Sequence, residues 1–145
     1  MTTILTKSVN NVDCHALNLF WNVAYLFENI YKAGNQFSDI SMRIGNKRFY
    51  CHRLILQLNS EYFAKEYFLA QDMELQKNIN PEQFYEVLQF IYTGEVIVST
   101  NNIKSLLSAA LKLRVPELIC ICFRFLEDAI NKTDTNMLRR TTHSK

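Results

Sequence analysis

The fold is decided by residues 37–63, which read FSDISMRIGNKRFYCHRLILQLNSEYF. Apolar side chains at positions 40, 42 and 44 alternate with polar ones, which is the period-2 pattern of a strand with one buried face. The pair Gly45-Asn46 follows and can take the positive φ angles of a tight hairpin turn. Lys47–Cys51 then has the pattern of the return strand. We therefore expect a two-stranded antiparallel hairpin here.

A helix is expected directly after this hairpin, over residues 52–63. Its apolar face is predicted from side chains that keep helical spacing, namely Leu54, Ile55, Leu58 and Tyr62. A two-stranded ribbon packed on such a helix is common, so this local pattern alone does not identify a function.

The composition indicates one globular, helix-rich domain. The chain has 145 residues, of which 48% are hydrophobic and 21% charged, so it can build a core. Only 3 glycines and 2 prolines are present, which argues against an all-β fold dense in turns. The net charge of +2 is too small to indicate direct nucleic-acid binding by itself.

The four cysteines indicate free thiols in a reducing compartment rather than a disulfide framework or a zinc site. Three of them fall among apolar residues, and none has a finger-like set of partners; they are Cys14, Cys51, Cys120 and Cys122. The first residues lack the apolar core of a signal peptide, and no apolar run approaches the roughly 18 residues of a membrane span. We expect a cytoplasmic or nuclear protein that does not contact membranes.

The first long helix carries the strongest physical indication of function. Asp13 is a suitable N-cap, and the helix is expected from about Cys14 to Lys32, ending at Gly34. Its apolar arc spans about half the circumference or more, against about 100° for an ordinary surface helix. Either the chain itself buries this helix on several sides, or one side meets a second copy of the protein.

Short strands and amphipathic helices alternate along the rest of the chain. Asn80 and Gln83 have capping-box spacing around Pro81, so a helix is expected to begin there and to stop at Gly94. Further strands are expected within 2–9, 72–76 and 95–99, and further helices after Asn101-Asn102 and after Val115-Pro116.

No pattern of catalytic residues emerges. His15, His52 and His143 are scattered, and His52, at the start of a helix, is expected to be a structural histidine with its hydrogen bonds satisfied. There is no phosphate-binding glycine loop, no nucleophile elbow and no paired-carboxylate setting. We expect neither an enzyme nor a bound cofactor or metal.

Several short motifs at consistent spacing resemble the BTB/POZ family. The motifs are Ser38-Asp39-Ile40, His52–Leu56, Ser60–Phe63, Pro81–Phe84, Leu88–Glu95, Ala109–Leu111 and Val115–Leu118. The resemblance extends from about residue 13 to 130. It implies an α+β fold in which a helix cluster is capped by a short mixed β-sheet, and a homodimer formed through the first long helix.

The resemblance also implies an interface and a division of the chain. The dimer interface would contain Leu17, Leu19, Phe20, Val23, Ala24, Leu26, Phe27, Ile30, Asp39 and Arg53, with the last two facing each other near its floor. Asp39 could instead be a cap or turn residue without a partner. Residues 1–12 would be an N-terminal segment whose strand is exchanged between subunits. Residues 13–130 would form the BTB/POZ domain.

Phe125-Leu126-Glu127 followed by Asn136-Met137-Leu138 resembles the opening of the BACK segment that follows BTB in kelch-like cullin-3 adaptors. Residues 131–145 would then be the start of a BACK-like segment, or else a tail. This resemblance implies a substrate adaptor of a cullin-3 RING ubiquitin ligase. The stretch between Phe63 and Pro81 is shorter than in those adaptors and offers only Ala64-Lys65-Glu66 in place of their apolar-x-Glu motif, which puts the cullin contact in doubt. The contact would fall to Tyr67, Phe68, Leu69 and an exposed Tyr92, although Tyr67 and Phe68 could also be core. The alternative is the dimerisation and corepressor-binding domain of a BTB transcription regulator.

Overall fold

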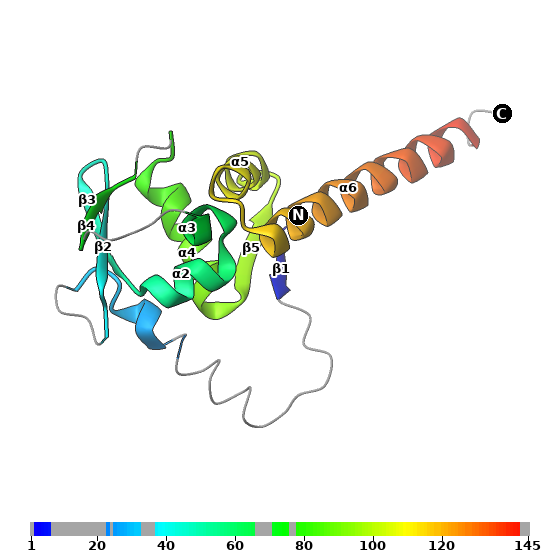
Figure 1. The fold of residues 1–145 in the computed structure, drawn as a ribbon. Helices are drawn as coiled ribbons and strands as arrows, with labels where there is room; N and C mark the ends of the chain where they lie inside the picture. Colours follow the sequence, from blue (N-terminus) through cyan, green and yellow to red (C-terminus); the bar gives the residue numbers. More distant parts are fainter. Residues whose placement is uncertain are drawn as a thin grey trace, which may run out of the picture.

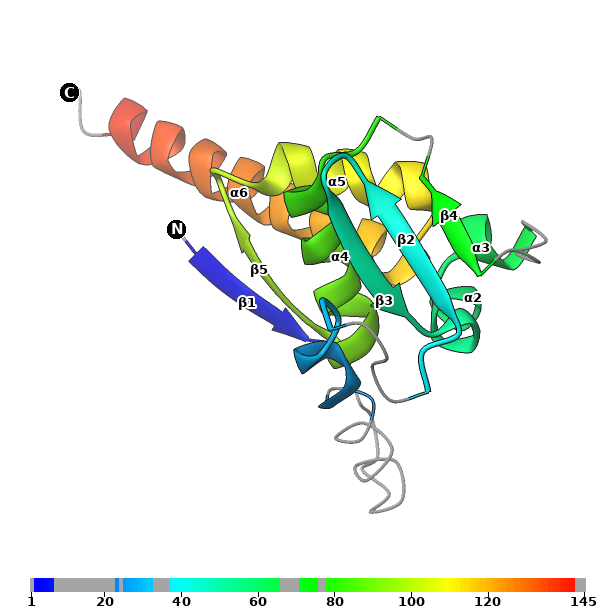
Figure 2. The ribbon, with the colours of Figure 1, turned by 90° about the vertical axis from the view of Figure 1, so that its left-hand side faces the viewer.

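The computed structural model describes residues 2–6, 23, 25–32, 37–65, 71–75 and 78–142. Four helices form the centre of the domain: α2 (Arg53–Asn59), α3 (Glu61–Lys65), α4 (Pro81–Thr93) and α5 (Ile103–Leu113). A three-stranded sheet lies at one end of this cluster, and a two-stranded ribbon lies along another side (Figures 1 and 2). The expected α+β organisation, a helix cluster with a short mixed sheet, is confirmed.

The hairpin forms at the predicted residues. Strands β2 (Ile40–Ile44) and β3 (Lys47–Cys51) pair antiparallel with Met42 opposite Phe49, and both of these side chains are completely buried. Only Gly45 of the turn has a positive φ, at 58°, so the expectation that Asn46 shares it is wrong. Strand β4 (Asp72–Glu74) adds to β2 in parallel, which makes the sheet mixed.

The single helix predicted over 52–63 is in fact two helices separated by Ser60. Ser60 has an extended backbone, with φ −133° and ψ 120°, and its buried hydroxyl donates a hydrogen bond to the Leu113 carbonyl oxygen at 2.5 Å. The side chains that α2 and α3 bury are Leu56 and Phe63. The predicted apolar face is therefore wrong for Leu54 and Leu58, which point to solvent.

Helix α4 is the centre of the core. Its predicted capping box is present: the Gln83 backbone N–H donates to Asn80 Oδ1 at 2.8 Å, and the Asn80 N–H donates to Gln83 Oε1 at 3.0 Å. Gly94 ends the helix with φ 72°, in the left-handed region that favours glycine. Between these ends the helix buries Phe84, Val87, Leu88, Phe90, Ile91 and Tyr92.

The N-terminal strand pairs within the chain. Strand β1 (Thr2–Thr6) runs antiparallel to β5 (Glu95–Ser99), with Ile4 opposite Ile97. Exchange of this strand with a second copy stays a prediction.

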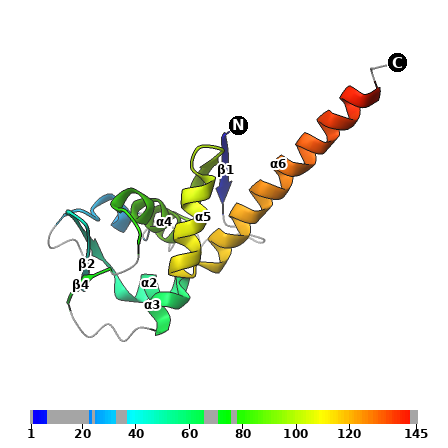
Figure 3. The same ribbon diagram turned by 90° about the horizontal axis from the view of Figure 1, so that it is seen from above.

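The last helix, α6 (Pro116–Thr142), is 27 residues long and projects from the domain (Figures 1 and 3). Its first turns are anchored in the core through Leu118, Cys122 and Phe125, whereas residues 131–137 are all exposed. The helix continues through Thr142, beyond the polar boundary at Asn131. Whether 131–145 begins a BACK-like segment stays a prediction.

Candidate functional site

The helix expected to form the dimer interface is only partly within the described residues. Leu17, Leu19, Phe20 and Ala24 lie outside them. Val23 and residues 25–28 are helical, and a turn follows at 29–31, so the helix ends before the predicted Lys32.

Within this segment the apolar side chains divide between the core and the surface. Phe27 and Ile30 are 9% and 1% exposed and pack in the chain's own core, and the Ile30 carbonyl oxygen accepts a hydrogen bond from the Tyr50 backbone N–H at 2.6 Å. Val23 and Leu26 are half-buried. Ile30 therefore has almost no side-chain surface left for a second copy, and any interface through this helix depends on its other residues.

Asp39 and Arg53 face each other within one chain, at the start of α2. Asp39 Oδ1 accepts a hydrogen bond from the Arg53 backbone N–H at 2.7 Å, and Asp39 Oδ2 lies 3.8 Å from Arg53 Nε. The local N-cap residue, His52, makes no side-chain capping bond, so Asp39 supplies the cap from 14 residues earlier in the chain. The pair fixes the direction in which α2 leaves the sheet.

A buried hydrogen-bonded pair lies just beneath this helix start. The Tyr92 hydroxyl accepts from the His52 backbone N–H at 3.0 Å and lies 2.9 Å from His52 Nδ1. Both residues are buried, at 1% and 6% exposed. The expectation that His52 is a satisfied structural histidine is confirmed. The expectation that Tyr92 is exposed for a cullin contact is wrong, because it falls on the inner face of α4.

The surface next to Asp39 and Arg53 is apolar. Leu54 and Leu58 lie one turn apart on α2 and are 66% and 75% exposed. Phe37, two residues before Asp39, is 77% exposed and has a φ of 62°, which is unusual for an aromatic residue. We call Leu54 and Leu58 the α2 leucine pair. Sequence periodicity assigned this pair to the core, and the structure places both side chains on the surface instead.

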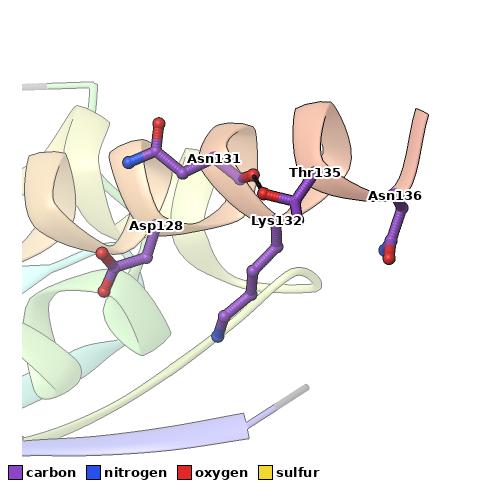
Figure 4. A pocket seen from close by; sticks show the side chains of 5 residues that line it. All are labelled: Asp128, Asn131, Lys132, Thr135 and Asn136. Carbon is purple, nitrogen blue, oxygen red and sulfur yellow. Dashed lines mark hydrogen bonds between the residues drawn. The ribbon is translucent and has the colours of Figure 1, made fainter. Parts of the chain in front are cut away.

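The described residues also line two hollows. One, of about 400 Å³, lies beside α6, and the described residues that line it are polar side chains of that helix, from Asp128 to Asn136 (Figure 4). A hydrogen bond joins two of these described residues, from Thr135 Oγ1 to the Asn131 carbonyl oxygen at 2.8 Å, and it lies within the helix. The other, of about 440 Å³, lies between α4 and β5.

The described part of the chain shows neither a candidate metal site nor a helix suited to cross a membrane. Its residues contain no group of three His, Cys, Asp or Glu side chains placed to hold a metal ion. None of its helices is long and apolar enough to cross a membrane. The remaining residues expected to contact a cullin, Tyr67, Phe68 and Leu69, lie outside the described residues.

The described residues thus form a small α+β domain that exposes several large apolar side chains. Residues 27–130 match the model of the BTB/POZ domain, and the chain belongs to this family. The match begins 14 residues later than the expected domain start, so the boundary at residue 13 stays a prediction.

Curated relatives include mouse Kelch-like protein 40, 30% identical over 95 residues, and mouse Kelch-like protein 1, 32% identical over 101 residues. These matches take in 63% and 66% of this chain but only 15% and 13% of the relatives. Among solved structures, the BTB domain of zebrafish PATZ1 has a TM-score of 0.68 at 26% identity, covering 84% of this chain and 99% of that one. The BTB domain of human gigaxonin has a TM-score of 0.66 at 21% identity, covering 83% and 99%. The resemblance to BTB/POZ and kelch-like proteins is confirmed.

Proposed function

We propose that the chain is a homodimeric protein–protein interaction module that serves as the substrate-adaptor part of a cullin-3 RING ubiquitin ligase. The observation that carries the dimer is the α2 leucine pair. Two leucines one turn apart, both more than half exposed, present an apolar surface that a second copy related by a two-fold axis can bury. The Asp39–Arg53 contact beside it holds α2 in place.

The dimer surface combines this pair with the half-buried Val23 and Leu26. It also includes the undescribed Leu17, Leu19, Phe20 and Ala24 as predicted from the sequence. Because the side chains of Phe27 and Ile30 are buried in the core of their own chain, they hold the helix against the domain and do not contact the partner.

The adaptor role is supported by the kelch-like relatives and by the long α6, which carries the proposed start of a BACK-like segment away from the domain. With Tyr92 buried, the cullin contact is proposed for Tyr67, Phe68 and Leu69. A corepressor-binding role stays the alternative, and the expected location in the cytoplasm or nucleus stays a prediction.

The adaptor role is tested by gel filtration of the purified chain with the N-terminal region of cullin-3. We expect the two to migrate as one complex, and the variant Tyr67→Ala/Phe68→Ala/Leu69→Ala to lose it while keeping the molar mass of the parent. A control with Leu111→Ala, on the exposed side of α5, should bind as the parent does. Separate migration of the parent and cullin-3 at tens of micromolar would contradict the adaptor role. The dimer is tested independently, by the molar mass of the purified chain alone.

A further inference from the structure

The hollow between α4 and β5 has a composition suited to a cationic side chain. Its volume is about 440 Å³, and its walls include an aromatic pair, a carboxylate and an aliphatic floor: Tyr31, Tyr85, Glu86, Val96 and Ile97. This groove lies on elements other than α2, the helix that carries the leucine pair. Neither the proposed dimer contact nor the cullin contact uses it.

One wall is a stacked aromatic pair. The rings of Tyr31 and Tyr85 are almost parallel, with an interplanar angle of 7° and centroids 5.8 Å apart. Tyr31 is held from another side by Phe49, with ring centroids 5.0 Å apart, yet it remains 49% exposed. Aromatic surface held this rigidly attracts a guanidinium through the ring quadrupole and offers it a flat stacking partner.

The charge of the groove is negative. Lys47 and Glu82 also line the groove, and Lys47 Nζ lies 3.4 Å from Glu82 Oε1, so these two charges offset each other. Glu86 is half-buried, and its hydrogen-bond partner, Asn102 Nδ2, lies at the long distance of 3.5 Å. Among the described residues Glu86 has no ion-pair partner. Burial raises the pKa of this carboxyl above its ordinary value, which is the effect expected of a carboxylate removed from water without a cation beside it.

We propose that this groove binds an arginine side chain of a partner peptide, with the guanidinium stacked on the Tyr31–Tyr85 pair and hydrogen-bonded to the Glu86 carboxylate. Arginine fits better than lysine because its planar group can stack and donate to a carboxylate at the same time. The hydrocarbon stem of the arginine would lie along Ile97, which is 51% exposed. Because one side chain supplies the contact, binding of an isolated peptide is weak, on the order of a millimolar Kd.

The test is a nuclear magnetic resonance titration of the full chain with the peptide acetyl-Gly-Arg-Gly-amide. We expect saturable shifts of the Tyr31, Tyr85 and Ile97 signals. The same peptide with citrulline, which keeps the shape but lacks the charge, should give binding about tenfold weaker, as expected for loss of a charge-assisted hydrogen bond. Glu86→Gln should weaken arginine binding by a similar factor, since glutamine keeps an oxygen toward Asn102 and removes only the charge.

Glu127→Gln, which removes an exposed carboxylate on α6, is the matched control and should bind as the parent does. Equal shifts with the citrulline peptide, equal affinity in Glu86→Gln, or the absence of shifts at the two tyrosines would each overturn the proposal.

Discussion

Removing the α2 leucine pair should dissociate the dimer without unfolding the monomer. Fully burying a leucine side chain is worth about 2 kcal/mol. Since Leu54 and Leu58 are still 66% and 75% exposed in the single chain, a partner can gain about 1.4 kcal/mol from each. Alanine retains part of that gain, so the substitution Leu54→Ala/Leu58→Ala loses about 1 kcal/mol at each site. In a two-fold dimer each site occurs twice, and the loss of about 4 kcal/mol raises the dissociation constant about a thousandfold.

Sedimentation equilibrium over a range of concentrations measures this dissociation constant directly. Alanine is the best helix former, so α2 should persist, and urea unfolding of the monomer should change by no more than about 0.5 kcal/mol. The matched control is Leu111→Ala/Ile130→Ala, which truncates two side chains that are 50% and 60% exposed on α5 and α6. A dissociation constant equal to that of the parent, or an equal loss in the control, would refute the assignment of the interface to α2.

Three further predictions concern single side chains. Asp39→Ala should destabilise the chain by about 1 kcal/mol in urea unfolding. Asp39→Asn keeps an acceptor for the Arg53 N–H and should cost less. Equal costs for the two variants would show that the lost stability does not come from the capping hydrogen bond. Tyr92→Phe should cost about 1–3 kcal/mol because it leaves the buried His52 N–H without its acceptor, and an unchanged unfolding midpoint would contradict this. Burial raises the pKa of Glu86, so the folded state favours its protonated form, and its ionisation destabilises the fold above that pKa. In urea unfolding near neutral pH, Glu86→Gln should therefore be more stable than the parent. This difference in stability should shrink as the pH falls through the raised pKa, and a difference that grows as the pH falls would contradict the prediction.

Local signals in the sequence were sufficient for the hairpin and for the start and end of α4. The strands at 40–44 and 47–51 follow from alternation and a turn glycine, and the Asn80 cap follows from residues within three positions of one another. Each of these features is set by neighbours along the chain, which sequence reasoning can see.

The features that sequence reasoning missed depend on residues far apart. The break at Ser60 is held by a bond to Leu113, 53 positions away, and the exposure of the α2 leucine pair depends on how α2 as a whole packs on the domain. Tyr92 is buried because α4 is surrounded on many sides, and its hydroxyl finds His52, 40 positions away. A helical repeat shows that one face is apolar, but it cannot show which neighbouring element buries that face.

The interface helix shows the same limitation. Its wide apolar arc indicated more than one contact surface, and the structure assigns Phe27 and Ile30 to the core of the chain itself. The part of the arc within residues 13–22 lies outside the described residues, so the sequence remains the basis for its proposed contact with a second copy.

The claim that most of this account depends on is that two copies of the chain associate. Light scattering on the purified parent chain at micromolar concentrations tests it most directly. We predict a molar mass of twice the 17.0 kDa of the single chain. A mass of 17.0 kDa that persists to tens of micromolar would contradict the account.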